Sequence, residues 1–231
     1  KPDSTSFMRE WLSLVESGTG ERGIFNRQAA KTQAAKNGRR DASYEFGTNP
    51  CSEIILRPYQ FCNLSEVVIR STDTEQDLER KVAIATILGT LQSTYTKFPY
   101  LRKIWEENTN EERLLGVSLT GIMDNPLTTT ANPDLQGLLE RLRAVSVEVN
   151  AQWAAKLGVA VSTAITAVKP SGTVSQLVNS ASGIHARHSE YYIRTVRGAY
   201  NDPLTEFMKD QGIPWEPCVH QPDTTVVFSF P

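Results

Sequence analysis

The chain has 231 residues, of which 39% are hydrophobic, 22% charged and 8% aromatic, a composition typical of one large globular domain or two small ones. Its formal net charge of −2 gives no long-range attraction for nucleic acid or an anionic membrane. No stretch approaches the roughly 18 consecutive apolar residues of a membrane span, and the first residues lack the apolar core of a signal peptide. We therefore predict a cytoplasmic protein with a small-molecule partner, no membrane and no direct nucleic-acid binding.

The cysteine content and the two ends of the chain suggest a piece of a larger intracellular protein. Three cysteines are an odd number and too few for a structural disulfide framework, so any pairing is expected to be transient or catalytic. The sequence begins without methionine and stops directly after the β-branched run "TTVVFSF". We expect further sequence on either side.

Helices and strands are expected to alternate along the chain. The expected helices cover residues 5–16, 26–38, 73–97, 135–158 and 202–213. The expected strands cover residues 60–70, 114–122, 163–173, 191–196 and 224–230, the third of them running into a loop. Strands separated by helices of this length indicate right-handed crossovers and a parallel α/β sheet or barrel, with no clear domain boundary.

The helix expected at residues 73–97 carries the most detailed pattern. Thr72 and Glu75 have the spacing of a capping box at its start. One apolar stripe follows at helical spacing, made of Leu78, Val82, Ala85, Leu88, Leu91 and Tyr95. We expect this stripe to face the core.

The loop "AVKPSGTVSQ", residues 167–176, follows one of the expected strands. Ligands of α/β folds bind at the carboxyl ends of strands. Lys169, Ser171, Gly172 and Thr173 stand where backbone N–H groups and hydroxyls converge on an anion at the start of a helix. A Pro-Ser-Gly turn that serves only as a helix cap uses the same groups, so both interpretations stay open.

The stretch "GTNPCSEIILRPYQFCNLSE", residues 47–66, holds two of the three cysteines. If "NPCSE" is extended, Asn49, Cys51 and Glu53 share one face. A carboxylate beside a thiol raises the thiol pKa, which is unfavourable for a cysteine nucleophile and favours one-electron chemistry. The alternative is a buried cysteine next to a surface glutamate.

Three motifs together resemble a known family. "TNPCSEIILRPYQFCNLSEV", "KPSGTVSQ" and "GIHARHSEYYIR" occur in this order, and they resemble the finger loop and later segments of ribonucleotide reductases. The Pro-Cys-Ser form is most similar to the adenosylcobalamin-dependent (class II) ribonucleoside-triphosphate reductases. The resemblance implies an α/β fold, part of a ten-stranded barrel. The chain would be one fragment of that domain, with a helical lead-in (1–46), the finger loop (47–58) and the second half-barrel (59–231).

The resemblance also implies a role for each motif residue. Cys51 would become a thiyl radical, Glu53 the general base and Asn49 the group that holds the ribose hydroxyls. Cys62 would be one of the two reducing cysteines, with a partner outside this chain. The substrate phosphates would be bound by the loop formed of Ser171, Gly172, Thr173, Val174 and Ser175. The implied cofactor is adenosylcobalamin, the substrate a ribonucleoside triphosphate and the reductant a thioredoxin-type dithiol.

Other functions remain open as alternatives. The isolated chain is expected to be inactive without the other half-barrel, and it could be an inactive remnant or a split subunit that binds nucleotide phosphates or a partner reductase chain. An unrelated cysteine-dependent hydrolase would need a histidine beside Cys51. His185, His188, Cys218 and His220 do not have the spacing of a zinc site, so no metal site is predicted.

Overall fold

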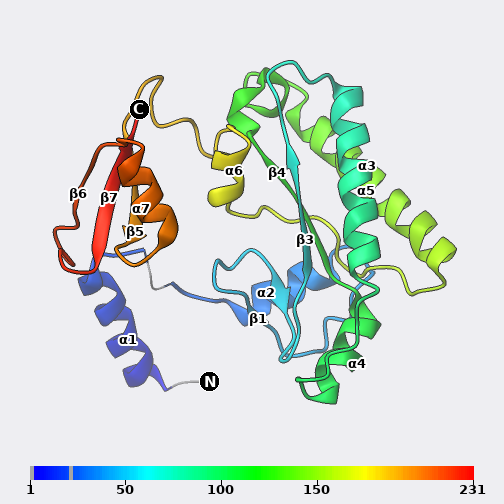
Figure 1. Ribbon diagram of the computed structural model, residues 1–231. Coiled ribbons are helices and arrows are strands. Elements are labelled where there is room, and N and C mark those ends of the chain that lie inside the picture. The colour runs from blue at the N-terminus through cyan, green and yellow to red at the C-terminus, as the bar shows by residue number, and fades with distance from the viewer. Residues whose placement is uncertain (1–2, 21–22) are drawn as a thin grey trace. The chain divides into compact units, whose positions relative to one another are not determined.

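Helices and strands alternate along most of the chain, as the sequence predicted (Figure 1). The computed structural model describes residues 3–20 and 23–231. The helices are α1 (Ser4–Ser17), α2 (Arg27–Ala35), α3 (Glu75–Gln92), α4 (Lys103–Glu112), α5 (Leu135–Leu157), α6 (Thr173–Leu177) and α7 (Pro203–Asp210), with short 3-10 helices η1 (Ile122–Asp124) and η2 (Pro126–Thr128). The strands are β1 (Gly47–Thr48), β2 (Ile55–Leu56), β3 (Asn63–Val68), β4 (Leu115–Thr120), β5 (Arg194–Ala199), β6 (Trp215–Pro217) and β7 (Thr225–Phe230).

The chain divides into two compact units, Lys1–His185 and Ala186–Pro231. The mixed α/β class that the sequence predicted is confirmed. In the part of the chain that the structure describes, the sheets have two, two and three strands, so the ten-stranded barrel stays a prediction. No helix in this part is long and apolar enough to cross a membrane.

The first unit is built around the parallel pair of β3 and β4. Asn63 lies opposite Leu115 and Val68 opposite Thr120. Helix α3 packs on both strands, and α5 packs on α3 (Figure 1). The buried core here contains Val67, Ile69, Leu78, Val82, Ala85, Leu115, Val117, Leu138, Leu142 and Ile165. Strands β3 and β4 contribute Val67, Leu115 and Val117 to this core, and α3 covers the pair.

The other edge of β4 lies against residues 164–167, but these residues do not form the strand that was expected. The amide of Val117 donates to the carbonyl of Ile165 at 2.8 Å, and the amide of Ala167 donates to the carbonyl of Val117 at 3.0 Å. Among the described residues, the pairing here is limited to one isolated parallel bridge between Val117 and Thr166. The end of β4 bonds to a later segment, since the amide of Gly121 donates to the carbonyl of Ala181 at 2.9 Å, and residues 168–172 form a loop.

Helix α3 begins two residues later than the sequence predicted. Thr74 and Asp77 form the capping box, with the Asp77 amide donating to Thr74 Oγ1 at 3.2 Å and the Thr74 amide donating to Asp77 Oδ2 at 3.1 Å. The predicted box at Thr72 is wrong, because a turn precedes the helix. In that turn the Asp73 amide donates to the carbonyl of Arg70 at 3.0 Å.

The predicted apolar stripe of α3 is correct only in its first half. Leu78, Val82 and Ala85 are buried, whereas Leu88, Leu91 and Tyr95 are 58%, 37% and 77% exposed. The second half buries small residues instead, namely Thr86, Gly89 and Thr90. A Cβ at Gly89 would lie 3.4 Å from the side chain of Leu115, so small size allows this part of the helix to approach β4.

The second unit is an antiparallel sheet with strand order β5-β7-β6 and the helix α7. The sequence predicted parallel pairing throughout, which is wrong for this unit, where β6 and β7 are joined by a short connection that permits only antiparallel neighbours. Val226 and Phe228 of β7 are fully buried. Strand β5 begins at Arg194 and not at Tyr191, since Tyr191 and Tyr192 are exposed and unpaired with β7.

Candidate active site

The stretch that carries Cys51 is the loop of a short hairpin formed by β1 and β2. Gly47 lies opposite Leu56 and Thr48 opposite Ile55. Between them the chain turns tightly: the Ser52 amide donates to the carbonyl of Asn49 at 3.0 Å, and Ser52 has a φ of 64°. The extended conformation considered for "NPCSE" is therefore wrong.

Asn49 and Glu53 are brought together by this turn and not by strand alternation. The amide group of Asn49 donates to Glu53 Oε1 at 2.6 Å. Its carbonyl oxygen accepts from the backbone amide of Ile54 at 3.0 Å, which holds the asparagine across the loop. The loop tip, formed by Pro50, Cys51 and Ser52, is exposed.

The carboxylate of Glu53 is the most constrained group of the site. Lys169 Nζ lies 2.6 Å from Glu53 Oε1, and the Glu53 side chain is only 6% exposed. Burial acts to raise the pKa of Glu53, but the hydrogen bonds from Lys169 and Asn49 and the Lys169 charge outweigh burial and lower that pKa. Glu53 is therefore an ionised carboxylate. Its second oxygen, Oε2, is buried and has no hydrogen-bond partner.

Lys169 connects the two motifs; the sequence placed it in the candidate anion-binding loop but predicted no contact with Glu53. Its pKa is raised, first by the hydrogen bond to Glu53, against burial, and also by the Glu53 charge and the thiols of Cys51 and Cys62. The ammonium group thus lies within electrostatic range of both cysteines. The sequence offered one signal, a lysine directly before Pro170 in the loop "VKPSGT", but nothing in the chain order links it to Glu53.

Cys62 lies just before β3 and is half-buried. Burial raises the pKa of the Cys62 thiol, the charge of Glu53 raises it further, and Lys169 partly opposes both. Cys62 is therefore a neutral thiol at neutral pH, which is the form that donates hydrogen and not the form that attacks as a nucleophile. Cys218 belongs to the other compact unit.

The base of the hairpin is held by a buried ionic network. Arg40 Nε donates to Glu112 Oε1 at 2.9 Å and Arg40 Nη2 donates to Glu112 Oε2 at 2.8 Å, a two-point contact between side chains that are 5% and 3% exposed. Arg40 Nη1 also donates to the carbonyl of Ile55 at 2.7 Å, and Gln60 donates to Glu112 at 2.6 Å. The network fixes β2 to the end of α4, so the loop tip projects from a rigid base.

The loop of residues 171–175 lies near the carboxyl end of β4. Gly183 packs beneath it, since a Cβ there would lie 3.6 Å from the Ser171 amide, and the Gly183 amide donates to Thr120 at 2.9 Å. Ser171 Oγ is buried without a hydrogen-bond partner. Ser175 is buried and its hydroxyl donates to the carbonyl of Gly172 at 2.7 Å, so that hydroxyl is already engaged within the turn. Thr173 and Val174 are exposed.

Comparisons with known proteins give one consistent result. No family model matches the chain. An adenosylcobalamin-dependent ribonucleoside-triphosphate reductase of Euglena gracilis is 31% identical over 208 residues, and one of Lactobacillus gasseri is 30% identical over 240 residues; each alignment covers 90% of this chain. A crystal structure of a B12-dependent (class II) ribonucleotide reductase superimposes with a TM-score of 0.62 and 27% identity over 79% of this chain.

The chain resembles the adenosylcobalamin-dependent ribonucleotide reductases. The family resemblance that the sequence motifs indicated is thereby confirmed. The chain spans only 28% and 31% of the two reductase sequences and 29% of the solved chain. It therefore corresponds to less than a third of a reductase of this kind.

Proposed function

We propose that this chain forms part of a ribonucleotide reductase and carries its radical cysteine loop. The observation that supports this most directly is the arrangement around Glu53. Asn49 and Lys169 both contact Oε1 of its carboxylate, whereas Oε2 has no hydrogen-bond partner. Glu53 belongs to the same loop as Cys51. A general base needs an ionised, positioned carboxylate with an unoccupied oxygen, and Glu53 has all three properties.

In the proposed reaction each residue of the loop has one task. The Cys51 sulfur, as a thiyl radical, takes the hydrogen atom from C3′ of the ribose, forming an S–H bond and leaving a carbon radical. Glu53 accepts the proton of the 3′ hydroxyl through Oε2, and Asn49 holds the ribose hydroxyls. Loss of the 2′ hydroxyl as water then requires two electrons and two protons, which a pair of thiols supplies when it is oxidised to a disulfide. Cys51 finally returns the hydrogen atom to C3′ and Glu53 returns the proton to the 3′ oxygen, which restores the thiyl radical and the carboxylate.

Cys62 is proposed as one thiol of that pair. Its raised pKa keeps it protonated, as a hydrogen donor requires. The second thiol would come from sequence outside this chain, and a thioredoxin-type dithiol would then reduce the disulfide.

The phosphates of a ribonucleoside triphosphate are proposed to bind at Ser171–Ser175. The unpartnered hydroxyl of Ser171 supports this, because a buried hydroxyl without a partner is costly unless a ligand satisfies it. Backbone amides of Gly172, Thr173 and Val174 would complete the contacts. The Ser175 hydroxyl is engaged elsewhere, so Ser175 would contribute only its amide.

Adenosylcobalamin is the cofactor named for the relatives, and we propose it for the complete protein. The residues around Cys51 do not by themselves fit a corrin ring, because Pro50, Cys51 and Ser52 form an exposed tip and not a concave surface. Its site would therefore be formed by other parts of the protein.

The short span of the chain relative to its relatives bears on the complete protein. We propose that residues 1–231 form one fragment of a ten-stranded barrel, the second half-barrel with its finger loop, and that the isolated chain is inactive. A cytoplasmic location and the absence of direct nucleic-acid binding stay predictions.

The proposal is tested by combining this chain with the missing parts of a homologous reductase, ribonucleoside triphosphate, adenosylcobalamin and a dithiol. Formation of deoxynucleotide is measured. We expect turnover with the wild-type chain, none with Cys51→Ser, a loss of about 10²- to 10⁴-fold with Glu53→Gln, and unchanged turnover with the control Cys218→Ser. Activity retained in Cys51→Ser would exclude the thiyl role. Nucleotide binding without turnover in any combination would instead support an inactive remnant.

A further inference from the structure

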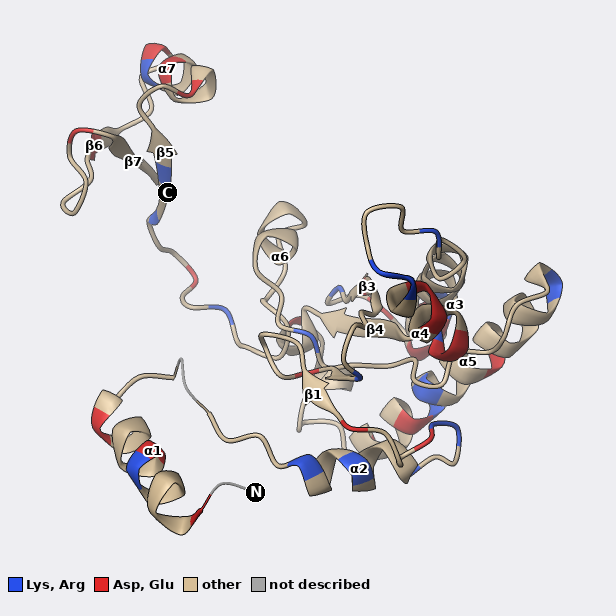
Figure 2. Ribbon diagram, turned by 90° about the horizontal axis from the view of Figure 1, so that it is seen from below, with Lys and Arg blue, Asp and Glu red and all other residues tan. Residues whose placement is uncertain are grey.

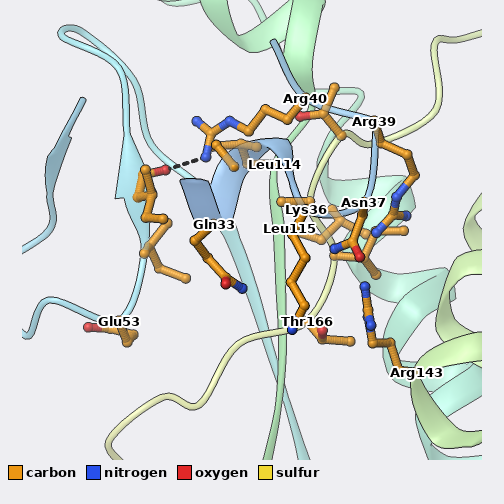
Figure 3. Close-up of a pocket in the computed structure, with 16 residues that line it drawn as sticks. Gln33, Lys36, Asn37, Arg39, Arg40, Glu53, Leu114, Leu115, Arg143 and Thr166 are labelled. Carbon is orange, nitrogen blue, oxygen red and sulfur yellow. Dashed lines mark hydrogen bonds between the residues drawn. The ribbon is translucent and has the colours of Figure 1, made fainter. Parts of the chain in front are cut away.

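A cavity of about 320 Å³ lies in the first unit, beside the hairpin that carries Cys51, and it is lined mainly by polar and positively charged groups. It is formed by the end of α2 and the loop that follows, residues 53–55 of the hairpin, the start of β4, residues 163–166 and the side chain of Arg143 from α5 (Figure 3). Figure 2 shows Lys and Arg bands on α2, but the basic residues of that helix, Arg27 and Lys31, do not line the cavity. The cationic side chains of the lining are Lys36, Arg39, Arg40 and Arg143.

The arginines of the lining differ in whether an acidic side chain already pairs with them. Arg40 is neutralised by Glu112 at 2.8 Å. Within residues 3–20 and 23–231, Arg39 has no acidic partner. Arg143 has one contact, 3.2 Å to Glu140, whose side chain is 63% exposed, and such exposed pairs contribute little.

Arg39 and Arg143 extend toward one another across the cavity, with the amide of Asn37 beside them (Figure 3). Burial and the like charge of Arg143 lower the pKa of Arg39. Two half-buried guanidinium groups that face each other repel unless an anion lies between them. An anion bound between the two guanidinium groups would attract both of them, and these attractions would outweigh the repulsion between the two arginines.

The chemistry of the lining selects the kind of anion. A guanidinium presents a rigid fork of N–H donors that matches an oxyanion at two points. A carboxylate has two oxygens, enough for one such fork, whereas a tetrahedral phosphoryl group can accept from two forks on opposite sides. The one acidic residue of the lining, Glu53, is paired with Lys169 at 2.6 Å and so offers little repulsion.

We propose that this cavity binds a phosphoryl-class oxyanion between Arg39 and Arg143, with Asn37 and Lys36 as further donors. The volume is at the lower end of the roughly 300–1,000 Å³ of small-molecule sites, which suits a phosphate group or a small phosphorylated molecule. This site is separate from the loop of residues 171–175, and it does not depend on the reductase function.

The test uses the complete 231-residue chain and calorimetric titration with inorganic phosphate and with tripolyphosphate. Each probe should bind saturably, with an affinity that weakens as salt concentration rises. Binding at residues 171–175 is distinguished by its loss in Ser171→Ala and its retention in Arg39→Gln. Arg39→Gln and Arg143→Gln should each weaken it at least tenfold. The control Arg80→Gln, which removes a charge from an exposed side chain of α3, should change it less than twofold. Similar affinity for both probes would indicate free phosphate, and tighter tripolyphosphate binding would indicate the phosphate chain of a larger molecule.

Thermal unfolding of the same variants shows whether a substitution weakens binding by disturbing the fold. Without phosphate, Arg39→Gln should unfold at the wild-type temperature or above it, since a repulsion is removed, and phosphate should raise the midpoint of the wild type only. Any of four results would overturn the proposal. The first three are no saturable binding, wild-type affinity in both arginine variants, and binding that is lost in Ser171→Ala and kept in Arg39→Gln. The fourth is an unfolding midpoint that Arg39→Gln lowers while phosphate still raises it.

Discussion

Glu53 owes its ionised state to two neighbours from different parts of the chain. Asn49 contacts the carboxylate from the same loop, and Lys169 contacts it from a segment far along the sequence. A buried carboxylate without such partners would take up a proton at neutral pH. Lys169 is therefore a positioning residue for the proposed base.

We predict that Lys169→Met destabilises the chain in a pH-dependent way. The folded-state pKa of Glu53 lies below its ordinary value of 4.5, so the stabilisation is full above pH 4.5 and is lost as the pH falls through the folded value. At neutral pH the variant should lose about 1.5–3 kcal/mol of unfolding free energy, the usual contribution of a hydrogen bond to a charged group. The deficit should shrink below pH 4.5. Urea unfolding at a series of pH values measures it.

Lys103→Met is the matched control for this experiment. Its side chain is 84% exposed and its ammonium group lies 3.7 Å from Glu107, so the loss of this charge should cost less than about 0.5 kcal/mol of unfolding free energy at every pH. A deficit of Lys169→Met that is the same at pH 3 and pH 7 would contradict the proposed pairing.

At the scale of residues, the sequence could name Asn49, Cys51 and Glu53 as candidates, because they lie within five residues of one another and form a family motif. It could not identify how they are arranged. The positive φ of Ser52 closes a turn that the alternation of an extended strand does not describe. The contact between Glu53 and Lys169 depends on the tertiary fold, and no local spacing contains it.

Among the elements, the hairpin of β1 and β2 is too short to be stable alone. The buried pair of Arg40 and Glu112 supports it from outside. We predict that Glu112→Gln lowers the unfolding free energy by about 3–5 kcal/mol, because Arg40 is left as an uncompensated buried charge. Denaturant unfolding measures this loss.

Glu107→Gln is the control on the same helix, since Glu107 is 54% exposed, and it should cost under about 0.5 kcal/mol. Equal effects of the two substitutions would show that the network does not support the hairpin. The double variant Arg40→Met/Glu112→Leu should recover much of the loss, because no unpaired charge remains.

The start of α3 gives a second prediction at the scale of elements. Thr74→Ala removes the hydroxyl that accepts from the Asp77 amide and should cost about 1 kcal/mol of stability. Thr72→Ala should leave stability unchanged, because Thr72 precedes the cap. Thermal unfolding of both variants distinguishes the two positions, and a larger loss from Thr72→Ala would place the helix start where the sequence alone suggested it.

Most elements could be predicted from hydrophobic periodicity, because the buried strands and the long helices carry strong patterns. The failures depend on tertiary contacts. Beyond Thr166 the end of β4 bonds to Ala181 and not to the predicted strand, and the small residues of α3 allow a close approach to β4 that an apolar stripe does not describe.

In the whole molecule, the two compact units have separate cores. Phe228 is fully buried in the second unit, and its loss should cost about 3–5 kcal/mol. For a unit of this small size such a loss is large. We therefore predict that Phe228→Ala abolishes the hydrogen-exchange protection of Arg194–Ala199 and Thr225–Phe230 while β3 and β4 stay protected.

Val67→Ala is the reciprocal control, since Val67 lies in the core of the first unit. It should reduce the protection of β3 and β4 and leave β5 and β7 unchanged. Loss of protection across both units with either variant would mean that the chain unfolds as one cooperative body.

The parallel pairing of β3 and β4 also determines the order in which the first unit can fold. Asn63 and Leu114, which meet at the start of the pair, are 51 residues apart in the chain. Closing so long a loop costs entropy before any strand contact compensates for it, whereas α3 and α4 can form locally within that loop. We therefore expect the helices to form early and the two strands to join late. The hairpin that presents Cys51 would become rigid only after α4 has reached its place beside Arg40.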